Sequence, residues 1–236
     1  MSFAKIYTRG LLGLHAPLIE VEVHVSSGMP SLTIVGLPEA AVRESKDRVR
    51  SAILNSGFQF PTKRLTINLA PADLPKDGSR LDLPIALGIL VASGQLPENC
   101  TDDLEFIGEL ALDAQLRPVT GILSIAIACQ HDQHQLMLPG PNAQEACQLP
   151  DFKVFAANHL KEVCEHLAQT QCLAEIQTIP VDTNHFYKCD LADVKGQLRP
   201  RRALEIAAAG GHSLLFRGPP GTGKTLLASR LASILP

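Results

Sequence analysis

The feature that most constrains the fold is a glycine-rich run near the end of the 236-residue chain. It reads GPPGTGKT from Gly218 to Thr225 and fits the phosphate-binding pattern G-x-x-x-x-G-K-[ST] at every fixed position. An apolar run, Ser213 to Phe216, precedes the loop, and a helical pattern, Leu226 to Ile234, follows it. This order predicts a buried strand, a loop and a helix, which would place an anion at the N-terminus of that helix.

The residue types in the run predict how it would hold a nucleotide. Glycine lets backbone N–H groups turn inward toward phosphate oxygens without a Cβ clash. Lys224 would reach the β- and γ-phosphates of ATP, and the Thr225 hydroxyl would ligate Mg²⁺. A surface loop could match by chance, but the correct flanks favour phosphate binding. The candidate cofactor-binding residues here are Gly218, Pro219, Pro220, Gly221, Thr222, Gly223, Lys224 and Thr225.

Hydrolysis of ATP needs groups that the sequence does not supply. An acidic metal ligand and a water-positioning group lie on later strands of such a module, and an arginine usually completes the site. We therefore expect a fragment cut just inside an ATPase module. It should bind nucleotide poorly and not turn it over, and we assign no catalytic residue.

The composition excludes several other classes of protein. A net charge of −3 shows no global basic excess of the kind typical of nucleic-acid binders. The longest apolar stretch, around Leu83 to Ala92, is too short to span a bilayer, and no secretory signal is present. The six cysteines form no C-x-x-C pair, so we expect reduced thiols in a cytoplasmic protein with no membrane partner.

Hydrophobic periodicity predicts a mixed α/β (α+β) domain over residues 1–170, a connector over 171–192, and the start of the nucleotide-binding module over 193–236. The strictly alternating stretch Ile19–Val25 and the stretch Leu32–Val35 are expected to pair as a hairpin. Asp82 is expected to cap the N-terminus of an apolar helix. The other expected strands are Leu65–Leu69, Phe106–Leu110 paired with Gln115–Val119, Leu136–Leu138 and Val154–Ala156, and the helices are Pro38–Gly57, Pro84–Ser93, Gly121–Cys129, His159–Ala168 and Pro200–Ala209.

Two clusters of side chains allow a functional and a structural interpretation. Arg43, Lys46, Arg48 and Arg50 would share the polar side of the helix that follows Pro38. Arg43, Lys46 and Arg50 could contact a DNA backbone or lie on a solvated face offset by acidic neighbours. We favour the solvated face. The run from Cys129 to His134 contains soft metal ligands but no second pair, so a polar helix end is favoured over a zinc site.

Several longer stretches resemble a known family. DVKGQ from Asp193 to Gln197, RALEIAAAGGH from Arg202 to His212, and GPPGTGKT resemble the start of a magnesium-chelatase-type AAA+ module. The stretches VSSGMPSLTIVGLPEAAVRESKDRVRSAILNSGF and INLAPADLPKDGSRLDLPIALGILVASGQL closely resemble the ComM/YifB family. The resemblance runs from end to end of the chain.

This resemblance implies a Lon-protease-like, ribosomal-protein-type fold for the front domain, followed by the first strand and helix of a P-loop AAA+ module. It implies homo-hexameric rings and DNA as the partner, through branch migration by a helicase in natural transformation. Val194 and Gly196 would lie beside the adenine of ATP. A motor that inserts Mg²⁺ into a porphyrin is the alternative that the same module would allow.

Lon-type peptidases use a serine activated by a lysine, so the front domain could also be a peptidase. The matching run here is PKDGSRLD, in which Arg80 occupies the serine position and Ser79 lies one residue early. Leu123 occupies the position of the lysine partner, and an apolar side chain cannot take a proton. We therefore expect a retained fold without the dyad, with a Ser79–Lys76 pair as the unfavoured alternative.

Overall fold

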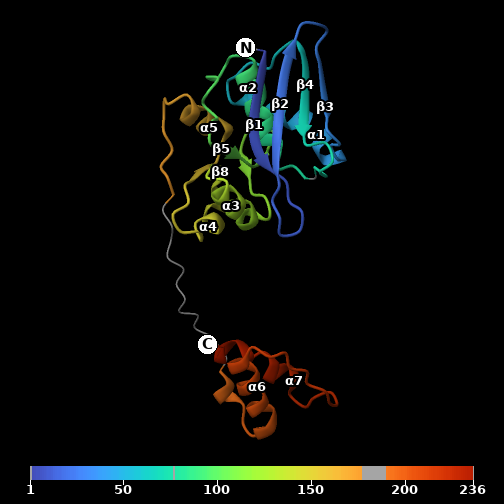
Figure 1. Ribbon diagram of the computed structural model, residues 1–236, viewed down its shortest axis with the longest axis vertical. Coiled ribbons are helices and arrows are strands. Elements are labelled where there is room, and N and C mark those ends of the chain that lie inside the picture. Colours follow the sequence, from blue (N-terminus) through green and yellow to red (C-terminus); the bar gives the residue numbers. More distant parts are fainter. Residues whose placement is uncertain (1, 77, 177–189, 236) are drawn as a thin grey trace. The chain divides into compact units, whose positions relative to one another are not determined.

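The computed structural model describes residues 2–76, 78–176 and 190–235, and its chain divides into two compact units, 1–180 and 181–236. Figure 1 shows the elements of each unit. Asp77 and residues 177–189 of the predicted connector, which include Cys189, lie outside the described residues.

A seven-stranded sheet organises the first unit, in the order β3-β4-β2-β1-β5-β8-β9. β1 pairs antiparallel with β2, and β2 pairs antiparallel with β4, while the other four pairings are parallel. A separate two-stranded ribbon joins β6 and β7. This mixed architecture confirms the predicted fold class. The strands are β1 (Phe3–Arg9), β2 (Leu18–Ser26), β3 (Ser31–Val35), β4 (Arg64–Ala70), β5 (Leu104–Phe106), β6 (Glu109–Leu110), β7 (Leu116–Arg117), β8 (Gln135–Pro139) and β9 (Val154–Ala157).

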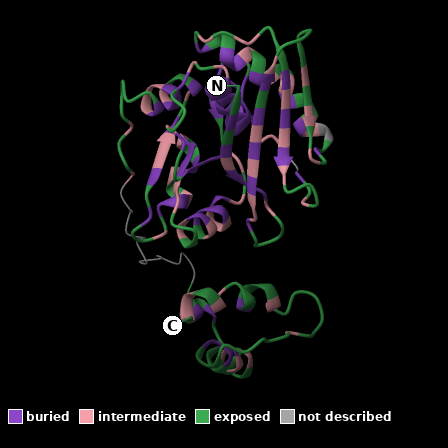
Figure 2. Ribbon diagram, turned by 45° about the horizontal axis from the view of Figure 1, so that its top comes forward, coloured by how far each residue is buried: buried purple, intermediate pink, exposed green. Residues whose placement is uncertain are grey.

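Helices α1 (Ala40–Asn55) and α2 (Asp82–Ala92) cover one face of the antiparallel part of the sheet (Figure 1). Alternate residues of β2 are buried against them, and Figure 2 shows this alternation as bands along the strand. Every residue of α2 is buried. Gly88 lets α2 approach the sheet closely, since a Cβ there would lie 2.6 Å from a methyl carbon of Val23. The largest core of the unit therefore lies between α1, α2 and this sheet.

Helices α3 (Ile122–His131), α4 (Ala143–Ala146) and α5 (Leu160–Leu167) accompany the parallel strands. The apolar side chains of α3 form a second core with β8 and β9, and those of α5 pack into the first core. Beyond β9, Ile176 N donates to Val154 O at 2.9 Å, so the chain pairs briefly with this edge of the sheet before the undescribed segment.

The second unit contains helices α6 (Leu198–Gly210) and α7 (Lys224–Ala228) and the short 3₁₀ turns Leu191–Asp193 and Leu231–Ile234. Its small core consists of Leu191, Val194, Leu204 and Leu227. No described helix of either unit is both long enough and apolar enough to cross a bilayer.

Two strand predictions are wrong, and one strand was not predicted. The stretches Ile19–Val25 and Leu32–Val35 both form strands but not a hairpin, because β4 lies between β2 and β3. β1 was not expected at all. Residues 213–216 form no strand, and Leu215 is 87% exposed, because no described strand pairs with this segment. The helix predicted after the loop is shorter than expected and ends at Ala228.

Asp82 does not cap α2 and Arg48 does not face solvent, which corrects two further predictions. Asp82 is the first residue of α2 and fully buried, and both of its carboxylate oxygens accept from Arg48, at 2.7 and 3.0 Å. Leu110 N also donates to Asp82, at 3.2 Å. Burial raises the pKa of Asp82 to about 6, although Arg48 and Leu110 N–H oppose the shift. A tertiary ion pair has replaced the local capping bond.

Candidate functional site

The GPPGTGKT loop follows residues 212–217, which form no helix or strand, and its last two residues, Lys224 and Thr225, begin α7. Gly221 and Gly223 have φ values of +80° and +79°, in the left-handed region that side chains with a Cβ rarely adopt. These two glycines reverse the chain so that Lys224 and Thr225 enter the helix. The tight loop therefore follows from the two glycines of the sequence motif, whose backbone takes left-handed conformations.

The polar groups of this loop fit a polyphosphate. Among the described residues, no acceptor takes the backbone N–H groups of residues 221–225. The ammonium of Lys224 donates to the carbonyls of Gly218 and Pro219, at 2.9 and 2.6 Å, so it folds back over the loop. Unpaired N–H donors beside a primary amine are the chemistry that recognises phosphate oxygens.

The segment Val194–Gln197 lies partly against this loop. Gln197 donates from its side-chain amide to Thr222 O, at 2.9 Å. Val194 is buried in the small core, and its carbonyl accepts from Arg201 at 3.2 Å. Gly196 is exposed, with a φ of +69°. The contact between Gln197 and the loop was not predicted, because residues 25 positions apart carry no periodic signal of their pairing.

In the first unit, the structure gives Ser79 and Lys76 different partners. The Ser79 hydroxyl donates to Glu109, and the Lys76 ammonium donates to Pro71 O. Lys76 is 1% exposed, and burial lowers the pKa of its amine, while Asp73 opposes the shift. Leu123 lies in the first turn of α3. A carboxylate partner does not provide the activated amine that a serine–lysine peptidase requires.

The cysteine and histidine side chains in the run from Cys129 to His134 are buried or contact carboxylates, and they do not converge on one point. Cys129 is buried on α3, and burial raises the pKa of its thiol above the usual range. His131 contacts Asp132, and His134 contacts the buried Glu105 at 2.8 Å. The five cysteines among the described residues are free thiols, and no group of three potential metal ligands occurs in that part of the chain.

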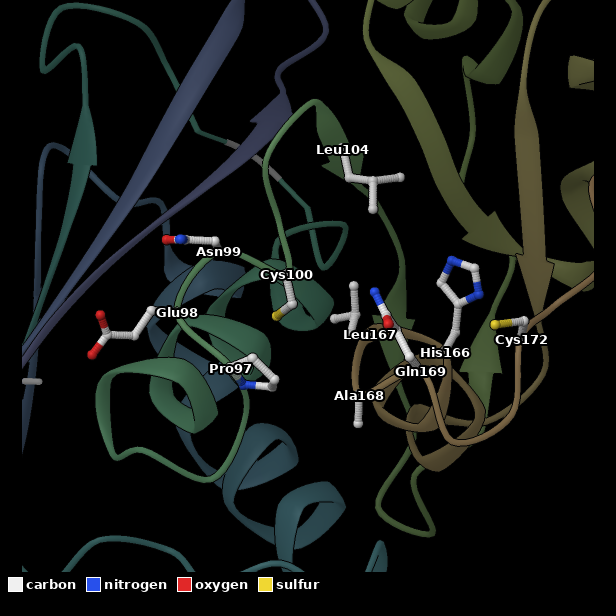
Figure 3. A pocket seen from close by; sticks show the side chains of 10 residues that line it. All are labelled: Pro97, Glu98, Asn99, Cys100, Leu104, His166, Leu167, Ala168, Gln169 and Cys172. Carbon is white, nitrogen blue, oxygen red and sulfur yellow. The ribbon is translucent and has the colours of Figure 1, made fainter.

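A separate hollow of about 950 Å³ lies between the loop that follows α2 and the C-terminal end of α5 (Figure 3). Figure 3 shows Glu98 at one end and Cys172 at the other, beside the His166 ring. Leu173 N donates to His166 Nδ1 at 3.0 Å, so this nitrogen already has a partner. None of the residues singled out as a nucleotide site lines the hollow.

The family described as "Subunit ChlI of Mg-chelatase" matches residues 21–142, more than half of the chain. The family described as "Magnesium chelatase, subunit ChlI" matches residues 190–236, which include the phosphate loop. The chain belongs to the magnesium-chelatase ChlI family. Both units thus contain a segment characteristic of the family.

Individual relatives narrow this assignment to a ComM/YifB-like member. The chain is 48% identical over 240 residues to "Competence protein ComM" of Haemophilus influenzae, and this match covers 100% of the chain and 47% of the relative. It is 50% identical over 240 residues to "Uncharacterized protein YifB" of Salmonella typhimurium and 49% identical over 237 residues to YifB of Escherichia coli, each covering 100% of the chain and 46% of the relative. The chain spans about half the length of the curated relatives it matches.

Proposed function

We propose that the chain supplies the front domain and the phosphate-binding loop of an ATP-dependent motor. The observation that carries the proposal is the GPPGTGKT loop, whose N–H groups at residues 221–225 have no described acceptor and whose Lys224 ammonium lies over the loop. The family assignment supports the use of ATP and Mg²⁺ by such a module.

The loop residues would divide the work of holding the nucleotide. The N–H groups between Gly221 and Thr225 would bind phosphate oxygens, and Lys224 would neutralise the β- and γ-phosphates after releasing the carbonyls it now contacts. Thr225 would hold Mg²⁺ through its hydroxyl. Bound Mg²⁺ would supply charge neutralisation on the phosphates. Val194 and Gly196 would lie beside the adenine, with Gln197 fixing the loop from the same side.

The parent motor would act on DNA as a cytoplasmic homo-hexameric ring, in branch migration during natural transformation or recombination. The 48% identity to a relative named as a competence protein supports this role. The front domain would shape assembly of the ring or guide DNA. The unit 181–236 supplies only the start of the nucleotide module, with domain limits at residues 170 and 193 proposed from the sequence.

The test compares the Lys224→Ala variant of the full-length parent protein with the wild type. We expect at least a tenfold loss of ATP affinity in calorimetry, since a charge-assisted hydrogen bond contributes about 1.5–3 kcal/mol. We also expect loss of branch migration on a synthetic four-way junction. Lys153→Ala removes an exposed lysine of the first unit and serves as the matched control.

Wild-type ATP affinity and branch migration in Lys224→Ala would contradict the proposal. A metal-insertion motor is the alternative that the description of the family supports, with Mg²⁺ as the substrate. Magnesium insertion into a porphyrin, assayed with chelatase partner subunits, distinguishes the two. Insertion that depends on Lys224, without activity on DNA junctions, would establish the alternative.

A further inference from the structure

A hollow of about 370 Å³ on the first unit is lined by three basic side chains, Lys46, Arg50 and Lys63. Lys46 and Arg50 come from α1, and Lys63 comes from the loop that leads into β4. The start of β3 forms another wall of the hollow, through residues 30–32. Asp47 is the one carboxylate among the lining side chains, so the hollow carries a net positive charge.

These cations have no ion-pair partner among the described residues, a property that Arg43, Arg64 and Lys153 share, whereas five other cations of the unit are paired. Lys5, Arg9, Arg48, Arg117 and Lys161 each lie within ion-pair distance of a carboxylate. Among the described residues, no carboxylate lies at that distance from Lys46, Arg50 or Lys63, although Asp47 lines the same hollow. Arg43, Asp47 and Arg50 are all exposed, so the solvated face favoured from the sequence stays a prediction beside the contact with a DNA backbone. Unpaired positive charge concentrated at one place attracts anions.

The cations also have a defined arrangement. The Arg50 guanidinium lies over the Phe60 ring, 4.9 Å from its centroid, which holds it at the surface. Arg43, Lys46 and Arg50 follow at helical intervals on one side of α1, and Arg43 is also exposed without an ion-pair partner among the described residues. The seven residues between Arg43 and Arg50 span about 10 Å of helix axis. The row is therefore long enough to face more than one phosphate of a nucleic-acid strand.

We infer that this hollow and the adjoining row on α1 bind the sugar–phosphate backbone of a nucleic acid. The inference rests on the proposed action on DNA but concerns a surface of the front domain, outside the ATP site. The cations come from a helix and a loop, while β3, whose first residues also line the hollow, is an edge strand of the sheet that could add an extended peptide. Three cations without an ion-pair partner and one carboxylate favour the repeated phosphates of a nucleic acid, and an acidic peptide is the competing outcome of the test.

Binding at this surface should be independent of base sequence. Phe60 is the one aromatic side chain of the hollow, and Arg50 already covers a face of its ring. No stacking platform for successive bases is formed by the lining residues. The affinity should therefore come from phosphate contacts and fall steeply with salt concentration.

The experiment measures binding of a fluorescein-labelled single strand to the 236-residue chain by anisotropy, at several sodium chloride concentrations. Lys46→Gln/Lys63→Gln should weaken binding about tenfold and lower the slope of log K against log salt by about 1.4, since each phosphate contact on a single strand contributes ~0.7. Two strands of different sequence should give the same result. Lys153→Gln/Lys161→Gln removes two lysines elsewhere on the unit and should leave both quantities unchanged.

Three results would overturn the inference: equal losses in the two double variants, an unchanged salt slope, or no binding by the wild-type chain. Competition by polyglutamate as effective as that by the same charge of oligonucleotide would also overturn it, in favour of an acidic protein partner. Thermal unfolding of both variants checks that the fold is intact. Lys224→Ala should bind the strand like wild type, so failure of the ATP site and failure of this surface are distinguishable.

Discussion

Arg48 pairs with the buried Asp82. We expect Arg48→Met to lower the free energy of unfolding of the first unit more at pH 7.5 than at pH 5. Asp82 has an ordinary pKa of 3.8 and a folded-state pKa of about 6. The folded state therefore holds this proton more tightly, and Asp82 lowers stability as pH rises from 3.8 to about 6. Without Arg48, the buried carboxylate loses the two hydrogen bonds that oppose the shift, at 2.7 and 3.0 Å.

The magnitude follows from the free energy of protonation. If the variant keeps Asp82 protonated at pH 7.5, the loss is about 1.5 pH units times 1.36 kcal/mol, or ~2 kcal/mol, which corresponds to roughly 4–8 °C in Tm. At pH 5 the wild-type carboxyl is already mostly protonated, so the loss should fall below ~0.5 kcal/mol. Urea unfolding followed by circular dichroism at both pH values measures the difference.

The control is Arg117→Met, which removes a 62% exposed partner of Glu109 and should cost less than ~1 kcal/mol at either pH. A loss in Arg48→Met that is the same at pH 5 and pH 7.5 would refute the reasoning. That result would mean that Arg48 stabilises the unit by packing, without controlling the charge on Asp82.

Two further substitutions test the fold of the first unit. Gly36→Ala should lower stability by more than ~2 kcal/mol in urea unfolding, because Gly36 has a φ of +95° and a Cβ there would lie 2.2 Å from Leu69 O; wild-type stability would contradict the close approach. Arg9→Met should cost about 3–5 kcal/mol, because it leaves the fully buried Glu105 without its bidentate partner at 2.6 and 2.7 Å. Lys5→Met, at an exposed pair, should cost under ~1 kcal/mol, and an equal loss in both variants would argue against a special role for burial.

The sequence predicted most elements of the first unit but not how they pair. Alternation in Ile19–Val25 and the apolar run in α2 depend on which side chains face the core, which is a local property of the chain. Strand pairing is a long-range property, and nothing in β2 distinguishes β3 from β4 as its neighbour. The same limit explains Asp82, where local propensity favoured a cap and Arg48, 34 residues away, formed an ion pair instead.

The backbone conformation of the candidate nucleotide loop could be predicted from the sequence, because it depends on the positions of the glycines. Gly221 and Gly223 take the left-handed conformations that the motif requires. The preceding strand was not correctly predicted, because apolar residues at 213–216 favour a strand only where another strand pairs with them. The sequence left two interpretations of the basic side of α1, a contact with DNA and a solvated face, because the positions of Lys46, Arg50 and Lys63 relative to one another depend on the fold.

The absence of a described strand beside residues 213–216 has a consequence for the energetics of the loop. Gly218 follows this segment almost directly, so one end of the loop is attached to backbone without a described strand partner, held through the packing of Phe216 on the small core, while α7 fixes the other end. Any strand that docks there would restrict the loop and remove part of the entropy lost on capturing a nucleotide. By thermodynamic reciprocity, nucleotide capture would strengthen the docking of that strand by the same factor.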